Sequence, residues 1–424
     1  MTQSASPVDP SELGSLVVVG LGYIGLPTAA MFASSGVDVT GVDISERAVE
    51  AVNSGTAHIE EGELDGLVEH CVNASRLRAR TTPVAADNFI IAVPTPIGHD
   101  GSHSPDVGFI RTAGESIAPC LKKGDLVILE STSPVGTTRM LADLLAQARP
   151  DLTFPHQTGE ECDVCLAYCP ERIIPGKMLQ ELVENDRIIG GMTPRCSERA
   201  SALYRVFVRG TCYISDDRTA EMVKLTENAF RDVNIAFANE LSMICSDLDI
   251  NAWEVIELAN RHPRVNILNP GPGVGGHCIA VDPWFIVASA PERAKLIRTT
   301  REVNDGKPEF VIAQVEEAMK KMPGTKVACL GLAYKPDVDD FRESPAFAIA
   351  TALSGRHGDR ILSSDPYAEA LPAQAREKAG LTVVPPEQAM EEAGIIVLLV
   401  GHTAFRAFPK PQGKVLLDTV GYWR

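Results

Sequence analysis

The chain is poor in basic residues and has no long apolar run. Its 424 residues include 39 Lys and Arg against 56 Asp and Glu, which gives a formal net charge of −17. A nucleic-acid-binding surface or a polybasic membrane patch needs clustered Lys and Arg, so this balance argues against both. No apolar run reaches the ~20 residues that span a bilayer. We therefore expect a protein that binds neither nucleic acid nor membrane.

A secretion signal is also missing from the N-terminus. Residues 1–15 are polar and carry Asp9 and Glu12, which predicts a flexible leader and a cytoplasmic protein. The apolar and charged fractions, 45% and 22%, are those of an ordinary globular protein. At this length we expect two to three domains.

The ten cysteines are scattered and do not resemble a disulfide framework. Cys162, Cys165 and Cys169 have a spacing that is compatible with metal ligation. However, the apolar residues around them are typical of a buried strand, and no second ligand cluster follows. We predict that these thiols are structural and that the protein has no metal site.

The N-terminal part carries a dinucleotide-binding pattern. An apolar strand from Leu16 runs into Gly20-Leu-Gly-Tyr-Ile-Gly25, and a helical stretch over residues 26–34 follows. This is G-x-G-x-x-G in its strand–turn–helix context, where backbone N–H groups and the helix N-terminus accept a pyrophosphate. A second strand over residues 37–42 ends in Asp43, whose carboxylate suits the adenosine ribose and would repel a 2′-phosphate. We predict an NAD site that includes Gly20, Gly22, Tyr23, Ile24, Gly25 and Asp43.

The same alternation of strand and helix continues along the chain. Apolar runs over residues 88–93 and 125–130 end in Pro94-Thr-Pro96 and Ser131-Thr-Ser133. Such runs, separated by helical stretches, predict a parallel sheet that is covered on both faces. Ligands of these sheets bind at the carboxyl ends of the strands, where Thr95 and Thr132 fall. Each threonine could equally be a turn former. Strands over residues 164–168 and 187–191 close this domain, and Glu171 follows the first of them.

From about Asp217 to Leu248 the pattern is that of one long helix without interior Gly or Pro. A helix of this length between two domains is a connector and often a dimer surface. Its Lys224 and Asn228 are four residues apart and share one face, which could also be an ordinary solvated face. Further helical stretches are expected over residues 253–260 and 292–322, the second interrupted near Gly306 to Pro308.

A glycine-rich segment follows this helical region: Gly271-Pro-Gly-Val-Gly-Gly-His-Cys-Ile-Ala-Val-Asp-Pro-Trp-Phe285. Glycines at this density mark backbone that bends sharply or approaches a ligand closely. Cys278 lies beside His277 and four residues before Asp282, which makes it a candidate nucleophile. The alternative is a tight surface turn whose cysteine is only a small buried apolar residue.

The C-terminal part repeats the strand pattern, at residues 326–330, 360–365, 395–400 and 414–418, without the full glycine fingerprint. Lys335 and Arg342 lie on loops at strand ends and suit a diphosphate or a sugar. We therefore predict an α/β chain with two Rossmann-like doubly wound domains joined by a long central helix and a helical middle domain. The expected ranges are 16–214 for the NAD domain, 215–320 for the middle and 321–424 for a second nucleotide domain.

Taken together, these segments resemble the UDP-glucose/GDP-mannose dehydrogenase family over nearly the whole length. The similar segments are Gly20 to Gly25, Pro94-Thr-Pro96, Glu130-Ser-Thr132, Pro170-Glu171, Lys224 with Asn228, Gly275 to Cys278 with Asp282, and Gly331 to Lys335 with Arg342-Glu-Ser344. The resemblance implies a two-step oxidation of a UDP-sugar at C6 to a carboxylate with two NAD. His277 and Val281 stand where the UDP-glucose branch typically has Ser and Lys. The implied substrate is therefore UDP-N-acetyl-D-mannosamine, with UDP-N-acetylglucosamine and, less so, UDP-glucose as alternatives.

The resemblance also implies residue roles. Cys278 would form a thiohemiacetal and then a thioester, Lys224 and Asp282 would handle the proton and the alkoxide, Asn228 would donate to the oxyanion, and Glu171 would activate the hydrolytic water. The implied substrate-binding residues are Arg172, Gly275, Gly276, His277, Lys335 and Arg342. The central helix is similar to the family's dimer element, which implies a homodimer.

Two other classes of function are compatible with part of the pattern. A single-step NAD-dependent hydroxy-acid dehydrogenase would share the N-terminal half, but it would need neither Cys278 nor a second nucleotide domain. A non-enzymatic NAD-binding module would leave Lys224, Asn228, Cys278 and Asp282 without a role. The sequence favours the two-step dehydrogenase over both.

Overall fold

The computed structural model describes residues 9–59, 61–98, 103–173 and 176–424. The chain divides into two compact units, Met1–Thr226 and Glu227–Arg424. Residues 1–8 of the predicted leader lie outside the described residues. The remainder of that segment carries the short 3-10 helix η1 (Pro10–Glu12), and the backbone N–H of Ser15 donates to Asp87 Oδ2 at 2.8 Å.

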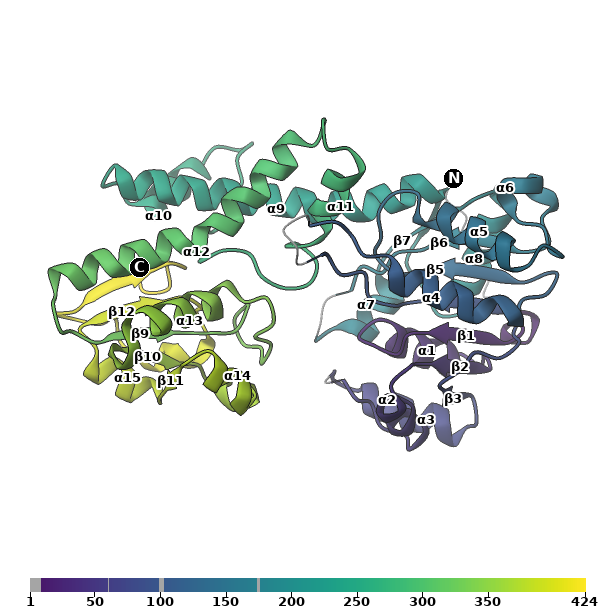
Figure 1. Cartoon of the computed structure of the whole chain (residues 1–424), viewed down its shortest axis with the longest axis horizontal. Coiled ribbons are helices and arrows are strands. Elements are labelled where there is room, and N and C mark those ends of the chain that lie inside the picture. Colours follow the sequence, from purple (N-terminus) through teal and green to yellow (C-terminus); the bar gives the residue numbers. More distant parts are fainter. Residues whose placement is uncertain (1–8, 60, 99–102, 174–175) are drawn as a thin grey trace. The chain divides into compact units, whose positions relative to one another are not determined.

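The first unit is built on an eight-stranded sheet in the order β3-β2-β1-β4-β5-β6-β7-β8 (Figure 1). Its strands are β1 (Leu16–Val19), β2 (Val39–Val42), β3 (Leu77–Arg80), β4 (Asn88–Ile91), β5 (Leu126–Leu129), β6 (Cys165–Tyr168), β7 (Arg187–Gly191) and β8 (Cys212–Asp216). All neighbours pair in parallel except β6 and β7, which are antiparallel. The prediction of a parallel sheet therefore fails at β7, because an apolar run does not encode strand direction.

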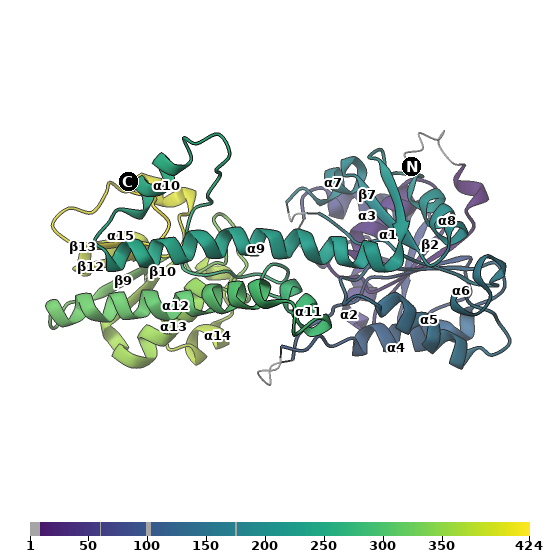
Figure 2. The same cartoon turned by 90° about the horizontal axis from the view of Figure 1, so that it is seen from above.

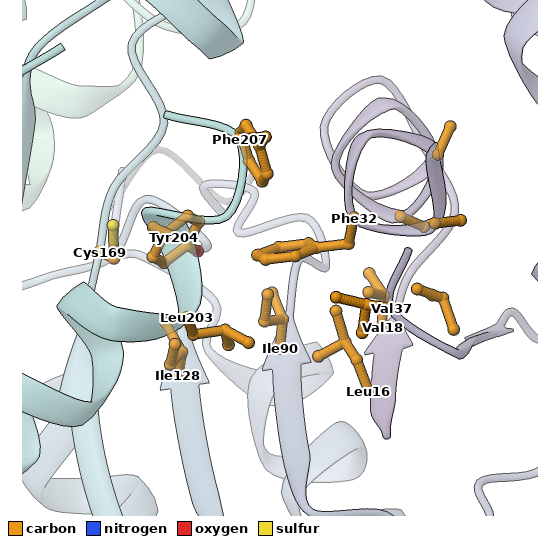
Figure 3. Packing of buried hydrophobic residues seen from close by; sticks show 14 of the residues in the cluster. Leu16, Val18, Phe32, Val37, Ile90, Ile128, Cys169, Leu203, Tyr204 and Phe207 are labelled. Carbon is orange, nitrogen blue, oxygen red and sulfur yellow. The ribbon is translucent and has the colours of Figure 1, made fainter. Parts of the chain in front are cut away.

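Helices cover both faces of this sheet. They are α1 (Gly25–Ser34), α2 (Glu46–Asn53), α3 (Leu64–Asn73), α4 (Gly108–Ile117), α5 (Thr137–Ala148), α6 (Pro155–Thr158), α7 (Met178–Glu184) and α8 (Pro194–Tyr204). Alternate strand residues enter two different cores: Val18 and Ile90 belong to one, and Val17 and Phe89 belong to the other. In the first core, Phe32 of α1 packs edge-on against Phe207 at 4.8 Å between ring centroids (Figure 3). Burial on both faces explains why the strands read as continuous apolar runs.

The helix α9 (Asp217–Asp247) begins in the first unit and continues into the second, as the sequence predicts. Within the second unit it is followed by α10 (Ala252–Ala259), α11 (Asp282–Ser289) and α12 (Lys295–Lys321). α9 and α12 run alongside each other (Figures 1 and 2). Their contact is polar and buried: Arg301 Nη1 lies 2.7 Å from Asp232 Oδ1, and Asn239 Nδ2 donates to Asn304 Oδ1 at 2.8 Å.

The predicted interruption near Gly306 to Pro308 is wrong, because α12 continues through both residues. Proline inside a helix removes one backbone hydrogen bond and costs ~3 kcal/mol. Here the helix is fixed on both sides of Pro308 by contacts with α9: Asn304 Nδ2 donates to Asp232 Oδ1 at 2.7 Å, and Gln314 Nε2 donates to Ser246 Oγ at 2.8 Å. Tertiary contacts of this kind outweigh the local preference to end the helix.

A second sheet of five strands, all paired in parallel, forms the C-terminal part in the order β11-β10-β9-β12-β13. Its elements are β9 (Val327–Leu330), α13 (Pro345–His357), β10 (Ile361–Ser364), α14 (Ala373–Lys378), β11 (Thr382–Val383), α15 (Pro386–Glu392), β12 (Ile395–Leu398) and β13 (Val415–Asp418). Val327 and Ala328, adjacent in β9, enter opposite cores, so this sheet too is covered on both faces. The predicted fold class of two doubly wound sheets and a helical middle is confirmed. None of the helices in the described ranges is long and apolar enough to cross a membrane.

Candidate active site

The turn after β1 shows three different uses of glycine. Gly20 has φ +94°, and a Cβ there would lie 2.5 Å from the carbonyl oxygen of Ala92. A Cβ on Gly25 would lie 1.8 Å from the carbonyl oxygen of Gly20, so this glycine lets α1 start directly against the turn. A Cβ on Gly22 would meet nothing within 4 Å. Gly20 and Gly25 therefore shape the turn, and Gly22 leaves the space that a pyrophosphate needs.

Asp43 directly follows β2 and is tied to this turn. Its Oδ2 accepts the backbone N–H of Leu21 at 2.9 Å, and its Oδ1 accepts that of Ser45 at 2.8 Å. Each carboxylate oxygen keeps a second lone pair for a ligand hydroxyl. The arrangement fits the ribose-binding role expected of Asp43.

The remaining candidate NAD residues follow neighbouring strands. Thr95 and Thr132 come after β4 and β5 and are half-buried, as is Ile24, whereas Tyr23 is exposed. The Thr95 hydroxyl oxygen is buried and has no hydrogen-bond partner within the part of the chain that the structure describes. Leaving such a group unsatisfied costs ~1–3 kcal/mol, so a polar ligand atom fits there. These residues thus suit a bound NAD.

Lys224 and Glu171 lie together in the first unit. Lys224 Nζ of α9 donates to the backbone carbonyl of Glu171 at 2.7 Å. The Glu171 carboxylate is buried, and its Oε1 accepts the backbone N–H of Arg172 at 2.7 Å. Arg172 in turn donates through Nη1 to the carbonyl of Asp186 at 3.1 Å. Two predicted catalytic residues and one predicted substrate residue are therefore neighbours.

Two further charged residues, for which the sequence predicts no role, belong to this neighbourhood. Arg187, the first residue of β7, has Nη2 2.7 Å from Glu171 Oε2. Its Nη1 lies 3.6 Å from Oε1 of Glu130, the residue that follows β5. Both side chains are almost fully buried. Their buried position could have been predicted from the sequence, because each charged residue directly adjoins an apolar strand, where a solvated residue is not expected.

The thiol loop lies in the second unit and ends where α11 begins. Cys278 is exposed, and its backbone carbonyl accepts the N–H of Asp282 at 2.8 Å. The Asp282 side chain is buried, and its Oδ2 accepts a hydrogen bond from Asn228 Nδ2 at 2.6 Å. Asn228 comes from α9, 54 positions earlier in the chain. The structure therefore brings Cys278, Asp282 and Asn228 together, as the predicted roles require.

Glycines let this loop pack against the C-terminal domain. A Cβ on Gly275 would lie 2.5 Å from the carbonyl oxygen of Glu343, and one on Gly276, which has φ +85°, would lie 3.3 Å from the ring of Tyr334. Both partners belong to the loops after β9. The predicted substrate residues Gly275 and Gly276 are thus placed next to the loops that carry Lys335 and Arg342.

The three polar substrate candidates of the second unit differ in their surroundings. Lys335 Nζ lies 5.5 Å from the centre of the Tyr334 ring. Arg342 makes a two-pronged ion pair with Asp340, with Nη2 2.7 Å from Oδ2. The pKa of His277 is lowered, mainly by desolvation of its ring and to a smaller extent by the positive charge of Arg342, even though the residue is exposed overall. The lowered pKa favours the neutral imidazole, which suits a hydrogen-bonding role.

Comparison with known proteins decides the family. The NAD-binding, central and UDP-binding domains of the UDP-glucose/GDP-mannose dehydrogenase family match residues 15–208, 218–306 and 328–424. The chain belongs to the UDP-glucose/GDP-mannose dehydrogenase family. It is 55% identical over 421 residues to the UDP-N-acetyl-D-mannosamine dehydrogenase of Salmonella typhi, with 97% of this chain and 99% of that protein covered. It is 56% identical over 414 residues to the NDP-N-acetyl-D-galactosaminuronic acid dehydrogenase of Ralstonia nicotianae, with 97% of each chain covered.

Solved structures agree with this membership. The chain is similar to the UDP-N-acetyl-mannosamine dehydrogenase Cap5O from S. aureus, with a TM-score of 0.85, 44% identity, and coverage of 97% of this chain and 96% of that one. The predictions of an NAD-binding dehydrogenase and of a UDP-binding domain are confirmed. The individual residue roles and the predicted domain boundaries stay predictions.

The cysteines of this family member gather differently from what their spacing suggests. The sulfur atoms of Cys162, Cys165 and Cys196 lie within 4.8 Å of one another, and all three residues are buried. Cys169 instead faces Arg187, with 3.9 Å from Nη1 to Sγ. The sequence shows no second ligand cluster, but the single residue Cys196 of α8 joins Cys162 and Cys165 in the folded chain. Among the described residues no fourth His, Cys, Asp or Glu joins the three, and a structural zinc ion is usually held by four ligands.

Proposed function

We propose that this chain oxidises UDP-N-acetyl-D-mannosamine at C6 to the uronate, in two successive NAD-dependent steps. The observation that carries the proposal is the turn that joins the exposed Cys278 to the buried Asn228–Asp282 pair. A single-step dehydrogenase would need no nucleophilic thiol there. The substrate named for the relatives from Salmonella typhi and S. aureus supports the choice of sugar.

In the first oxidation, the C6 hydroxyl must lose a proton. A water held by Asp282 suits that task, and the ammonium of Lys224 stabilises the alkoxide that forms. NAD, when bound, accepts one hydride from C6 in each oxidation. The Cys278 thiolate then adds to the aldehyde carbon, and the new C–S bond keeps the aldehyde from escaping.

The second oxidation converts this thiohemiacetal into a thioester. Asn228 and Lys224 are the proposed donors to the C6 oxygen. Hydrolysis then requires a water that loses a proton as it attacks, and Glu171 is the proposed base. The C–S bond breaks, the uronate leaves, and the thiol of Cys278 is restored. A thiolate suits both the attack and the departure better than a hydroxyl at neutral pH.

The UDP-sugar is held by the second unit in this account. Lys335 and Arg342 would meet the diphosphate and the sugar, and the close packing of Gly275 and Gly276 on the loops after β9 supports a shared binding surface. Arg172 and His277 are the remaining proposed substrate contacts. A neutral His277 can donate to or accept from a sugar hydroxyl or acetamido group.

A substrate panel tests the choice of sugar. The Ralstonia nicotianae relative is named for N-acetyl-D-galactosaminuronic acid, so the panel includes UDP-N-acetylgalactosamine beside UDP-N-acetyl-D-mannosamine, UDP-N-acetylglucosamine, UDP-glucose and GDP-mannose. Reduced NAD is followed by absorbance. We expect kcat/KM for UDP-N-acetyl-D-mannosamine to exceed each other value by at least about tenfold. A higher value for any other sugar would reject the substrate assignment.

We also propose a homodimer formed through α9. In the second unit Phe230, Phe237 and Ile244 are exposed by 68%, 58% and 47% and lie seven residues apart, so they line one face of the helix. Apolar stripes of this kind on a helix favour association with a matching surface. A reducing cytoplasmic location is proposed as well, because a nucleophilic thiol such as Cys278 is kept reduced there.

A further inference from the structure

The first unit buries three charged side chains around one point. Glu130, Glu171 and Arg187 are exposed by 2%, 7% and 3%. One guanidinium thus faces two carboxylates, Glu171 at 2.7 Å and Glu130 at 3.6 Å. Burying an uncompensated charge is costly, so a net negative charge at this point is disfavoured. One of the two carboxylates is therefore expected to hold a proton.

The surroundings favour a proton on Glu130. The pKa of Glu130 is raised to about 8, mainly by burial and to a smaller extent by repulsion from Glu171, although Arg187 opposes the shift. The other groups that face Glu130 are hydroxyls: Tyr204 of α8 donates to Oε1 at 3.0 Å, and Thr28 of α1 donates to Oε2 at 3.3 Å. Cys169, the remaining titratable neighbour, is neutral because burial raises its pKa to about 12.

The charge of Arg187 is then available to Glu171 alone. Arg187 itself is fixed, because its guanidinium lies over the Tyr204 ring at 4.5 Å from the ring centre. It holds Oε2 of Glu171 while the backbone N–H of Arg172 holds Oε1. The plane of the carboxylate is set by these two contacts, and each oxygen keeps a lone pair for a water.

We propose that Arg187 is the residue that positions Glu171 for hydrolysis of the thioester, and that protonated Glu130 leaves Arg187 free to do so. The inference rests on the proposed function, in which Glu171 activates the hydrolytic water. Arg187 touches neither substrate nor cofactor in this account, so it is a positioning residue. When Glu130 ionises at alkaline pH, two carboxylates compete for Arg187 and Glu171 loses its fixed orientation.

The test follows the two halves of the reaction separately. With UDP-N-acetyl-D-mannosamine and NAD, a stopped-flow burst of reduced NAD reports the two oxidations, and steady-state turnover reports hydrolysis. Intact-protein mass spectrometry after an acid quench detects the sugar adduct on Cys278. Glu171→Gln is the reference, because loss of the proposed base should leave the adduct in place.

Arg187→Met should keep the burst of two reduced NAD per site, slow steady-state turnover about 10²-fold, and accumulate the adduct. Arg187→Lys, which keeps the charge, should restore part of the rate. Arg301→Met is the matched control, since it also removes a buried guanidinium from a carboxylate, that of Asp232. The control should lose stability without accumulating adduct.

The pH dependence of hydrolysis in Glu130→Gln is a second test, and it does not depend on the folding of an arginine variant. In the wild type the hydrolysis rate should fall severalfold as pH rises through about 8, and this fall should be absent in Glu130→Gln. A fall that persists in the variant would overturn the proposal. The proposal would also be overturned if Glu171→Gln accumulated the adduct and Arg187→Met did not. If Glu171→Gln forms no adduct either, the proposed function itself fails.

Discussion

At the scale of single residues, exposure separates Cys278 from the other cysteines. Eight of the ten are buried, Cys120 is half-buried, and Cys278 is exposed. Burial raises the pKa of Cys71 to about 11 and that of Cys329 to about 12, so these thiols stay protonated. Cys165 has its pKa lowered to about 6 by a hydrogen bond from Cys196, but it is buried in the core. Among these thiols, exposure favours Cys278 as the proposed nucleophile.

Cys278→Ala should therefore abolish uronate formation, by about 10³-fold or more, because no other exposed thiol can replace it. NAD affinity, measured by fluorescence titration, should be unchanged. Cys120→Ala is the matched control and should keep full activity. A Cys278→Ala enzyme that still made uronate at near-normal rate would remove the nucleophile from the mechanism.

Lys307 gives a residue-scale prediction about pH. Burial against α9 lowers its pKa to about 8, well below the ordinary value near 10.5. Between these values the unfolded chain binds more protons than the folded one, so the contribution of Lys307 to stability rises with pH from about 8 to 10.5. At pH 7 its charge opposes folding by roughly 1 to 3 kcal/mol.

Lys307→Met, of similar shape but uncharged, should therefore be more stable than the wild type at pH 7 in urea unfolding. The gain should shrink as pH rises towards 10.5. The exposed Lys320→Met serves as the control and should show no such trend. A gain that did not vary with pH would indicate that packing, and not the buried charge, caused it.

At the scale of elements, the thiol loop depends on close backbone approach. Gly275 has ordinary φ but lies against the Glu343 carbonyl, whereas a Cβ on Gly271 would meet only one atom, 3.9 Å away. Gly275→Ala should displace the loop and lower kcat about 10²-fold, with the fold intact by circular dichroism. Gly271→Ala, the matched control, should keep its activity. Equal effects of the two changes would mean that flexibility, and not close contact, is what the loop needs.

Element patterns also show what the sequence could predict. Apolar runs predicted the strands, because burial on both faces leaves a direct signal in the sequence. The Gly20 to Gly25 turn predicted an NAD-binding domain, and a helical pattern without interior Gly or Pro predicted the long helix α9. Strand direction at β7 and the continuity of α12 through Pro308 depended on contacts between distant segments. The same holds for the contacts of Arg187 with Glu130 and Glu171, since the sequence does not show that these three residues lie together.

The candidate site was predictable where spacing is local. Cys278, His277 and Asp282 share one turn, and Lys224 and Asn228 share one helix face, so the proximity of the residues within each group could be predicted from the sequence. The pairing of Asn228 with Asp282 spans 54 positions and required the folded second unit. Glu171 was predicted from the family resemblance, but its contacts with Arg187 and with the backbone N–H of Arg172 were not.

At the scale of the whole molecule, the exposed face of α9 predicts assembly. Phe237→Asp should convert the proposed dimer into a monomer, because an unpaired carboxylate buried in an apolar interface destabilises the interface strongly. Light scattering after gel filtration measures the mass directly. Ile44→Asp, a change of the same kind at a residue 87% exposed in the first unit, is the control and should leave the dimer intact. A wild-type monomer, or a dimer that survives Phe237→Asp, would contradict the proposal.

The central claim is that one enzyme carries the sugar from alcohol to acid through a bond to Cys278. Counting the reduced NAD formed per molecule of UDP-N-acetyl-D-mannosamine consumed, together with chromatographic analysis of the product, tests it most directly. The account predicts two reduced NAD and the uronate, with no free aldehyde. One reduced NAD per sugar, or an aldehyde as the final product, would contradict it.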